Sequence, residues 1–269
     1  MPMPGTPSLP GDGDPRSPST SPDLEKPRAS KVRPELTRLP RLTWYRRLAR
    51  LWIRRLARIL VLTLTRCEVK GLKNFPAQGP ALVVTNHLGD ADAVLAVAYF
   101  PVFIDALAKM ELYEFPLLGW IMQAYGVIWV HRGQPDRRAI KAVMQGLEEG
   151  RIVGIAPEGR ESLTGGLEEG TGGAAYIALK AGVPLIPVTF TGTENQRIYP
   201  KLKRLSRTKV SLTVGPLFWL EKLLDRRESI QVGTQVIMEK LAQQLPPELR
   251  GVYQVQVAQG QHQLTSYRE

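Results

Sequence analysis

The sequence predicts a single α/β domain with a largely parallel mixed sheet flanked by helices, preceded by a basic amphipathic N-terminal helix. Two observations carry this prediction. Short apolar runs alternate with helical patterns from Glu68 onward, and eight arginines with no acidic residue stand before them, between Arg41 and Arg66. Strands and helices that alternate at such lengths are typical of α/β domains with parallel sheets. The chain has 269 residues, 43% of them hydrophobic, which is enough for a sizeable core.

The elements of the domain follow from runs that are apolar throughout and from runs with helical spacing. Asp90 is the expected N-cap of the first helix after Glu68, and Gly150 and Gly182 follow two later helices, where glycine commonly ends a helix. Strands are expected at 81–84, 102–108, 127–130, 152–156, 185–190 and 210–214, and helices at 91–100, 116–125, 136–149, 172–181 and 229–245.

Four segments of different composition divide the chain. We expect a disordered Pro/Ser-rich tail over 1–40, a basic amphipathic helix over 41–66, the α/β domain over 67–255 and a short tail over 256–269. The longest strongly apolar uncharged run near the N-terminus covers only 59–65, whereas a membrane-spanning helix needs about 20 residues. A membrane-spanning segment and a signal peptide are therefore not expected.

The predicted helix over 41–66 separates charge from apolar surface. On a helical wheel the apolar side chains, with two tryptophans, oppose a face formed by Arg46, Arg47, Arg50, Arg54 and Arg58. This pattern is typical of a helix that lies in a membrane interface, with its apolar side chains among acyl chains and its arginines at the phosphates of anionic lipid. The alternative is a helix packed on its own domain with a solvated basic face.

Composition excludes several other classes of site. The net charge is +11, and residues 41–66 alone supply +8 of it, so only this stretch would attract a polyanion. Nucleic acid is not an expected partner, because no groove-reading or base-stacking motif accompanies the charge. The three histidines are widely separated and there is one cysteine, so neither a metal site nor a disulfide is expected.

His87 is the strongest candidate for chemistry. It follows the expected strand at 81–84 and precedes a helix, with Asp92 five positions on. A carboxylate near a histidine can orient the ring and stabilise the imidazolium, so that the histidine acts as a base near neutral pH. Read alone, a His-x4-Asp pair is more often an ordinary surface turn.

Three further segments also fall at strand ends or loops. They are a strand that delivers Arg132, the turn Pro157-Glu158-Gly159-Arg160-Glu161, and a strand opened by Val183-Pro184. In open parallel sheets, ligands bind outside the carboxyl ends of the strands. A base, one or two arginines and a glycine-containing turn are therefore expected to converge on one crevice.

These four segments, in this order and spacing, resemble the four blocks of the glycerolipid acyltransferases, of which 1-acyl-glycerol-3-phosphate acyltransferase is the type member. The resemblance covers about residues 68–215 and includes Lys109-Met110-Glu111-Leu112 between the first two blocks. It implies that His87 is the base that deprotonates a glycerol hydroxyl and that Asp92 orients it. It further implies that Asn86, Arg132, Glu158, Gly159 and Arg160 shape the site or contact the acceptor. No cofactor is implied beyond acyl-CoA as co-substrate.

One departure from the family pattern concerns the acceptor. The common third block reads Phe-Pro-Glu-Gly-Thr-Arg-Ser, whereas here Glu161 stands where the family has arginine and Arg160 comes one position early. The resemblance implies acylation of a lysophosphatidic acid-type acceptor in phospholipid biosynthesis, on the cytoplasmic face of a membrane. The departure keeps another lysophospholipid or lipid alcohol open. A non-catalytic membrane-binding protein is a further alternative, although it would be expected to lack the base or its carboxylate.

Overall fold

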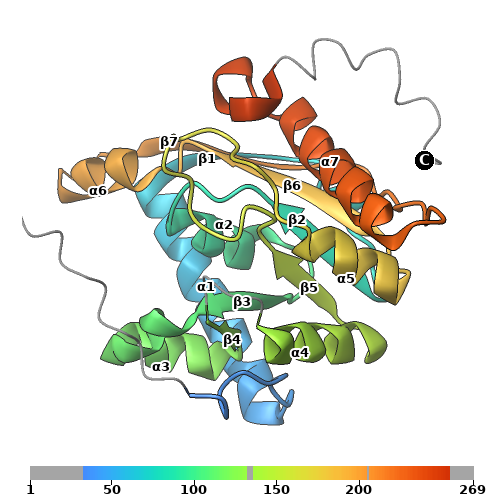
Figure 1. Cartoon of the computed structure of the whole chain (residues 1–269). Coiled ribbons are helices and arrows are strands. Elements are labelled where there is room, and N and C mark those ends of the chain that lie inside the picture. The colour runs from blue at the N-terminus through green and yellow to red at the C-terminus, as the bar shows by residue number, and fades with distance from the viewer. Residues whose placement is uncertain (1–32, 132–135, 205, 255–269) are drawn as a thin grey trace, which may run out of the picture. The chain divides into compact units, whose positions relative to one another are not determined.

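A seven-stranded mixed sheet organises the computed structural model, which describes residues 33–131, 136–204 and 206–254 (Figure 1). Its order is β1-β7-β6-β2-β5-β3-β4, and of the neighbouring pairs only β6 and β7 run antiparallel. The predicted fold class is thereby confirmed. The strands are β1 (Thr65–Lys70), β2 (Ala81–Thr85), β3 (Asp105–Lys109), β4 (Ile128–Val130), β5 (Ile152–Ile155), β6 (Leu185–Thr191) and β7 (Thr208–Val214).

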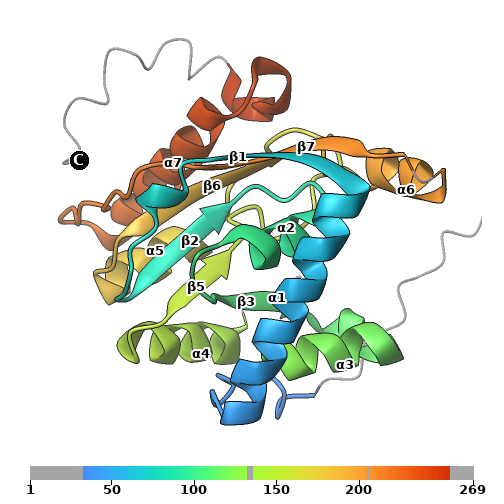
Figure 2. The same ribbon diagram turned by 180° about the vertical axis from the view of Figure 1, so that it is seen from behind.

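Helices cover both faces of the sheet (Figures 1 and 2). Helices α1 and α2 lie on one face, and α4, α5 and α7 lie on the other. The helices are α1 (Trp44–Leu64), α2 (Ala91–Tyr99), α3 (Pro116–Tyr125), α4 (Arg137–Glu148), α5 (Gly173–Ala181), α6 (Asn195–Lys203) and α7 (Arg226–Gln244).

Strand β2 shows why the central strands read as apolar runs. Leu82 and Val84 point into the core beneath α4, α5 and α7, while Ala81 and Val83 point into the core beneath α1 and α2. All four side chains are almost completely buried. A strand covered on both faces has no polar side, so its sequence is continuously hydrophobic.

Two elements are absent from the sequence prediction. Strand β1 carries alternating exposed charges because it forms an edge of the sheet, so its sequence does not read as a buried strand. Helix α6 is nine residues long, contains Pro200 and has no buried residue, so its sequence does not read as a core helix. The predicted tails lie wholly or largely outside the described residues, although Leu39 is buried in the core.

Helix α1 lies on the sheet with its apolar face outward. Arg50 is buried and Arg54 lies 3.7 Å over the ring of Phe103, whereas Trp52 and Ile59 are 60% and 58% exposed. The alternative of a helix packed on its own domain is therefore correct in the packing, but Arg50 and Arg54 of the basic face point inward and not into solvent. Among the described residues we found no helix with the length and hydropathy needed to span a bilayer.

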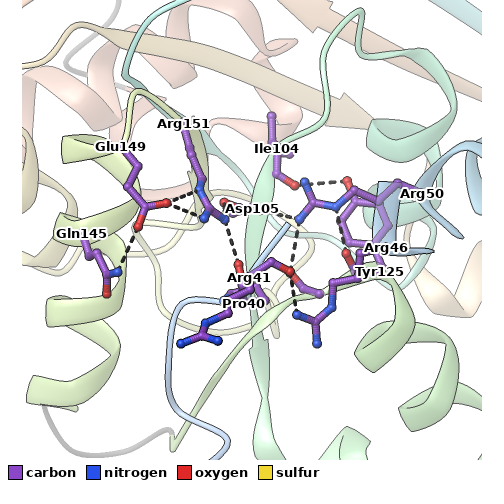
Figure 3. A network of polar contacts seen from close by, with 11 residues as sticks. Pro40, Arg41, Arg46, Arg50, Ile104, Asp105, Tyr125, Gln145, Glu149 and Arg151 are labelled. Atoms are coloured by element: carbon purple, nitrogen blue, oxygen red, sulfur yellow. Dashed lines mark hydrogen bonds and ion pairs between the residues drawn. The ribbon is translucent and has the colours of Figure 1, made fainter. Parts of the chain in front are cut away.

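A network of buried charges holds α1 in this orientation (Figure 3). Arg50 donates to the carboxylate of Asp105 at the start of β3 and to the carbonyl of Tyr125, 2.8 Å away. Arg151 reaches the other carboxylate oxygen of Asp105 at 3.3 Å. Burial of a charge is costly unless it is paired and hydrogen-bonded, and here each charged group has such partners. The network thus fixes the inward face of α1.

Candidate active site

The candidate site forms where β2 ends and the chain turns into α2. Asn86 and His87 follow the last residue of β2, and Asp92 lies in the first turn of α2. Because β2, β5 and β6 are mutually parallel, their carboxyl ends meet at one edge of the sheet. The segments after β2 and β5 therefore lie side by side, as expected for a ligand-binding edge of an α/β sheet.

His87 and Asp92 form a hydrogen-bonded pair. Nδ1 of His87 lies 2.9 Å from Oδ2 of Asp92, and the Asp92 side chain is 6% exposed. The carboxylate is the natural acceptor for an Nδ1–H, which leaves Nε2 as the unprotonated nitrogen. The His87 side chain is 24% exposed, so it is accessible to a substrate. The pair has the arrangement that a general base requires.

Asp92 also fixes the backbone of the loop that carries His87. Its Oδ2 accepts hydrogen bonds from the backbone N–H of Leu88 at 2.7 Å and of Gly89 at 3.1 Å. A Cβ at Gly89 would meet the Thr193 carbonyl at 2.6 Å, so the loop has no room for a side chain there. The carboxylate thus orients both the imidazole ring and the loop that holds it.

Asn86 is directed away from His87 and into the sheet. Its amide accepts a hydrogen bond from the Phe190 N–H at 2.8 Å and donates to the Phe190 carbonyl at 3.0 Å, and its side chain is buried. These two bonds extend the pairing of β2 and β6 beyond the end of β2. The geometry gives Asn86 a positioning role at the base of the site, and its predicted substrate contact stays a prediction.

Glu158, in the turn after β5, accepts a hydrogen bond from the backbone of His87. Its two carboxylate oxygens accept from the N–H of His87 at 3.2 Å and of Glu168 at 2.9 Å. The Ser162 N–H donates to the His87 carbonyl at 2.8 Å. Burial raises the pKa of Glu158 to about 7, against the lowering effect of its two backbone hydrogen bonds. Glu158 is therefore a buried side chain that links the His87 loop to the turn after β5.

The turn after Glu158 differs from an open phosphate cradle. Gly159 has a φ of 73°, which favours glycine at this position. Arg160 donates through Nε to Glu168 at 2.9 Å, and its Nη2 lies 2.7 Å from the same oxygen. Glu161 accepts from the Asn195 amide at 2.8 Å. Both charged side chains of the turn thus have protein partners.

Helix α6 contributes contacts that the sequence did not predict. The Tyr199 hydroxyl donates to Asp90 at 2.6 Å, and the Asn195 side chain accepts from the Asp90 N–H at 3.1 Å. Asp90 occupies the N-cap position of α2 as predicted, but its side chain makes no capping hydrogen bond and accepts from Tyr199 instead. Helix α6 is short and contains Pro200, and its pairing of Ile198 with Leu202 at a spacing of four is the one signal that could have drawn attention to it.

Two predictions lie beyond these contacts. Arg132 belongs to 132–135, outside the described residues, so its expected contact with the acceptor stays a prediction. Within the described residues, no cluster of three or more His, Cys, Asp or Glu side chains is arranged to hold a metal ion.

Comparisons with known proteins find acyltransferases that are similar to this chain. The family model described as Acyltransferase matches residues 66–191. A chloroplastic 1-acyl-sn-glycerol-3-phosphate acyltransferase of Brassica napus is 32% identical over 48% of this chain and 38% of its own length. A lyso-ornithine lipid O-acyltransferase of Pseudomonas aeruginosa is 34% identical over 46% of this chain and 47% of its own length. The chain thus spans less than half the length of these two relatives.

A solved structure shares the fold. The 1-acyl-sn-glycerophosphate acyltransferase of Thermotoga maritima superposes with a TM-score of 0.56 at 23% identity, covering 73% of this chain and 80% of that chain. The matched residues 66–191 run from the start of β1 to the end of β6 and include the His87–Asp92 pair. Residues 66–191 thus form an acyltransferase domain that is similar to those of the 1-acyl-sn-glycerol-3-phosphate acyltransferases.

Proposed function

We propose that this protein is an O-acyltransferase that moves a fatty acyl group from acyl-CoA to the free hydroxyl of a lysophosphatidic acid-type acceptor, on the cytoplasmic face of a membrane. The His87–Asp92 pair carries the proposal, because it holds a basic nitrogen at the carboxyl edge of the sheet. Relatives whose names record acyl transfer to lysolipids support the reaction class.

The proposed reaction is a direct transfer. Nε2 of His87 takes the proton from the acceptor hydroxyl as its oxygen attacks the thioester carbonyl. The C–S bond of the tetrahedral intermediate then breaks, and the thiolate of CoA takes the proton from the imidazolium. Asp92 stabilises the imidazolium between these steps through the 2.9 Å hydrogen bond. A general base contributes about 10²–10⁴-fold, so positioning of the substrates must supply much of the remaining rate.

A second acceptor class has support from the turn after β5. Arg160 is bound by Glu168, and Glu161 adds a negative charge beside it. An arginine paired in this way is less available to a phosphate than a free one, because part of its donor set is occupied. A lysolipid with a headgroup other than a bare phosphate is therefore the alternative acceptor, and the lyso-ornithine lipid relative favours it.

The membrane location is supported by the exposed face of α1. Apolar side chains follow one another at helical spacing along this face. Trp44 is 77% exposed and Leu56 is 55% exposed. An apolar surface of this extent on a described helix is typical of a surface that contacts a membrane or another protein. We therefore propose that α1 lies in the interface with this face among the acyl chains.

A panel of acceptors tests the proposed reaction. Purified protein would be given one labelled acyl-CoA with lysophosphatidic acid, lyso-ornithine lipid, lysophosphatidylcholine or monoacylglycerol, and CoA release and lipid product would be measured. The expected result is His87-dependent transfer, fastest with lysophosphatidic acid. Faster transfer to lyso-ornithine lipid would favour the alternative. A lack of CoA release with every acceptor would favour the non-catalytic protein.

A further inference from the structure

A run of basic side chains occupies α6 and the start of β7. The segment 197–209, here called the basic segment, has no acidic residue and six basic ones: Arg197, Lys201, Lys203, Arg204, Arg207 and Lys209. Five of the six are exposed, and Lys201 is half-buried. Within the described part of the chain, none of the four on or next to α6 lies within 4.0 Å of a carboxylate oxygen. This charge is available to an outside partner.

One end of the basic segment is fixed to the candidate active site. Tyr199 donates to Asp90, three residues after His87, and the helix starts at Asn195, which contacts both Asp90 and Glu161. A partner surface that binds to α6 would therefore lie close to the loops of the candidate active site.

The other end of the basic segment is fixed to the end of α1. Arg207 donates to the carbonyls of Leu62 at 2.7 Å and of Thr65 at 2.9 Å, and so caps the last turn of the helix. Both views show α6 beyond the ends of β7 and β1, near the end of α1 (Figures 1 and 2). The exposed apolar stripe of α1 thus leads to the basic segment.

The junction between the two surfaces is hollowed. A cavity of about 440 Å³ lies there, lined by the apolar Leu62 together with Arg66, Arg207 and Lys209. Cysteine 67 and Glu68 also line it. Apolar and cationic groups that meet in one recess match the boundary between acyl chains and phosphates at a bilayer surface.

The arginines of α1 contribute less to such a boundary than their number indicates. Arg50 is buried in an ion pair, and Arg54 is half-buried over the Phe103 ring. Part of the basic face of α1 therefore holds the helix on its domain, while Arg47, Arg55 and Arg58 stay exposed. We propose that the basic segment is a second membrane contact, which binds the phosphates of anionic lipids while α1 enters the bilayer. This inference rests on the proposed membrane location.

The occupant is a bilayer for two reasons. The charge is continuous with an apolar stripe, which a lipid surface can cover along its whole length. The same surface reaches the catalytic loops, where an acceptor that stays in the bilayer must arrive. Each basic residue close to an anionic bilayer contributes about 1 kcal/mol of binding free energy, so three together are worth on the order of 10²-fold in affinity.

The test compares two triple substitutions that remove equal charge. R197Q/K203Q/R204Q changes exposed residues of the basic segment. R137Q/R138Q/K141Q changes exposed residues of α4, which lies on the face of the sheet opposite α1. Binding to phosphatidylcholine vesicles, with and without phosphatidylglycerol, is measured by flotation. We expect R197Q/K203Q/R204Q to lose most of the gain in affinity that phosphatidylglycerol gives, on the order of 10²-fold, and the α4 variant to keep it.

Other outcomes separate this inference from the proposal beneath it. Equal binding of both variants to anionic vesicles would overturn the role of the basic segment while leaving α1 as a membrane helix. Failure of the wild-type protein to bind any vesicle would overturn the membrane location and this inference with it. A raised KM for acyl-CoA in neutral detergent micelles, with unchanged vesicle binding, would assign the segment to the donor phosphates instead.

Discussion

Arg50 of α1 and Asp105 of β3 form an ion pair in which the two side chains are only 4% and 1% exposed. The pair joins the helix that leads into the domain to the third strand of the sheet. A buried charge that loses its partner is strongly unfavourable, so any rotation of α1 that separates the two side chains is disfavoured. This relationship holds Arg50 in the interior, whereas Trp44 and Trp52 of the same helix are exposed.

Substitution of Arg50 alone should destabilise the fold. Arg50→Met leaves Asp105 buried with only Arg151 as a charged partner, and loss of one member of a buried pair costs about 3–5 kcal/mol. The free energy of unfolding, measured with urea, should fall by this amount. The double variant R50M/D105N should recover part of the loss. A single variant as stable as the wild type would show that the pair does not fix α1.

Substitution of His87 or Asp92 should strongly lower turnover without loss of folding. His87→Ala removes the proposed base and Asp92→Asn weakens the imidazolium, so each should lower kcat by about 10²–10⁴-fold. His131, which lies 3.6 Å from Asp136, provides a second His–Asp pair for comparison. His131→Ala should retain activity within about tenfold of wild type, since only the first pair acts as the proposed base. Activity of His87→Ala near that of the wild type would refute the proposed mechanism.

Substitution of Asn86 should act through the sheet. Asn86→Ala leaves the buried N–H and carbonyl of Phe190 without their side-chain partner, and each unpaired group costs about 1–3 kcal/mol. The control is Asn74→Ala, because Asn74 makes one half-buried hydrogen bond, to Val214, and should cost less. Thermal unfolding distinguishes the two. Equal losses of stability would indicate that the two hydrogen bonds to Phe190 stabilise the fold no more than the single hydrogen bond of Asn74.

The pKa of Glu158 predicts how stability varies with pH. Burial raises this pKa from 4.5 to about 7 in the folded protein, so the folded state holds a proton that the unfolded state releases between these values. The associated stability is present below pH 4.5 and is lost as pH rises through about 7, by on the order of 3 kcal/mol. Unfolding free energies at pH 5 and pH 8 should differ less in Glu158→Gln than in the wild type. An unchanged pH difference would contradict the raised pKa.

Elements buried on both sides were predictable because burial leaves a direct trace in the sequence. Strand β2 is apolar at four consecutive positions, so its place in a parallel sheet follows from its composition. The proximity of His87 and Asp92 was also predictable, since a helix that starts between them brings the two side chains together. Surface elements such as α6 leave no such trace, and α6 was missed.

Long-range partners were beyond the reach of the sequence. Asn86 pairs with Phe190, 104 positions away, and Arg50 pairs with Asp105, 55 positions away. A helical wheel shows which residues of α1 share a face but does not show which face meets the domain. The face that meets the domain depends on the carboxylate of Asp105 in β3, and only folding brings this carboxylate to Arg50.

The outward face of α1 yields a prediction that spares the core. Deletion of α1 would also remove the buried side chains of Ala57 and Val61, so substitution of exposed residues is the cleaner test. W52Q/L56Q reduces the apolar stripe, whereas W219Q/L224Q changes a second exposed Trp and Leu, which precede α7. Removal of one exposed tryptophan and one leucine from an acyl environment forfeits about 1.5–3 kcal/mol for each side chain. Flotation on phosphatidylcholine vesicles should therefore weaken at least tenfold for W52Q/L56Q and remain unchanged for W219Q/L224Q. Equal flotation of both variants would show that α1 does not enter the bilayer, because its apolar stripe would then contribute nothing to binding.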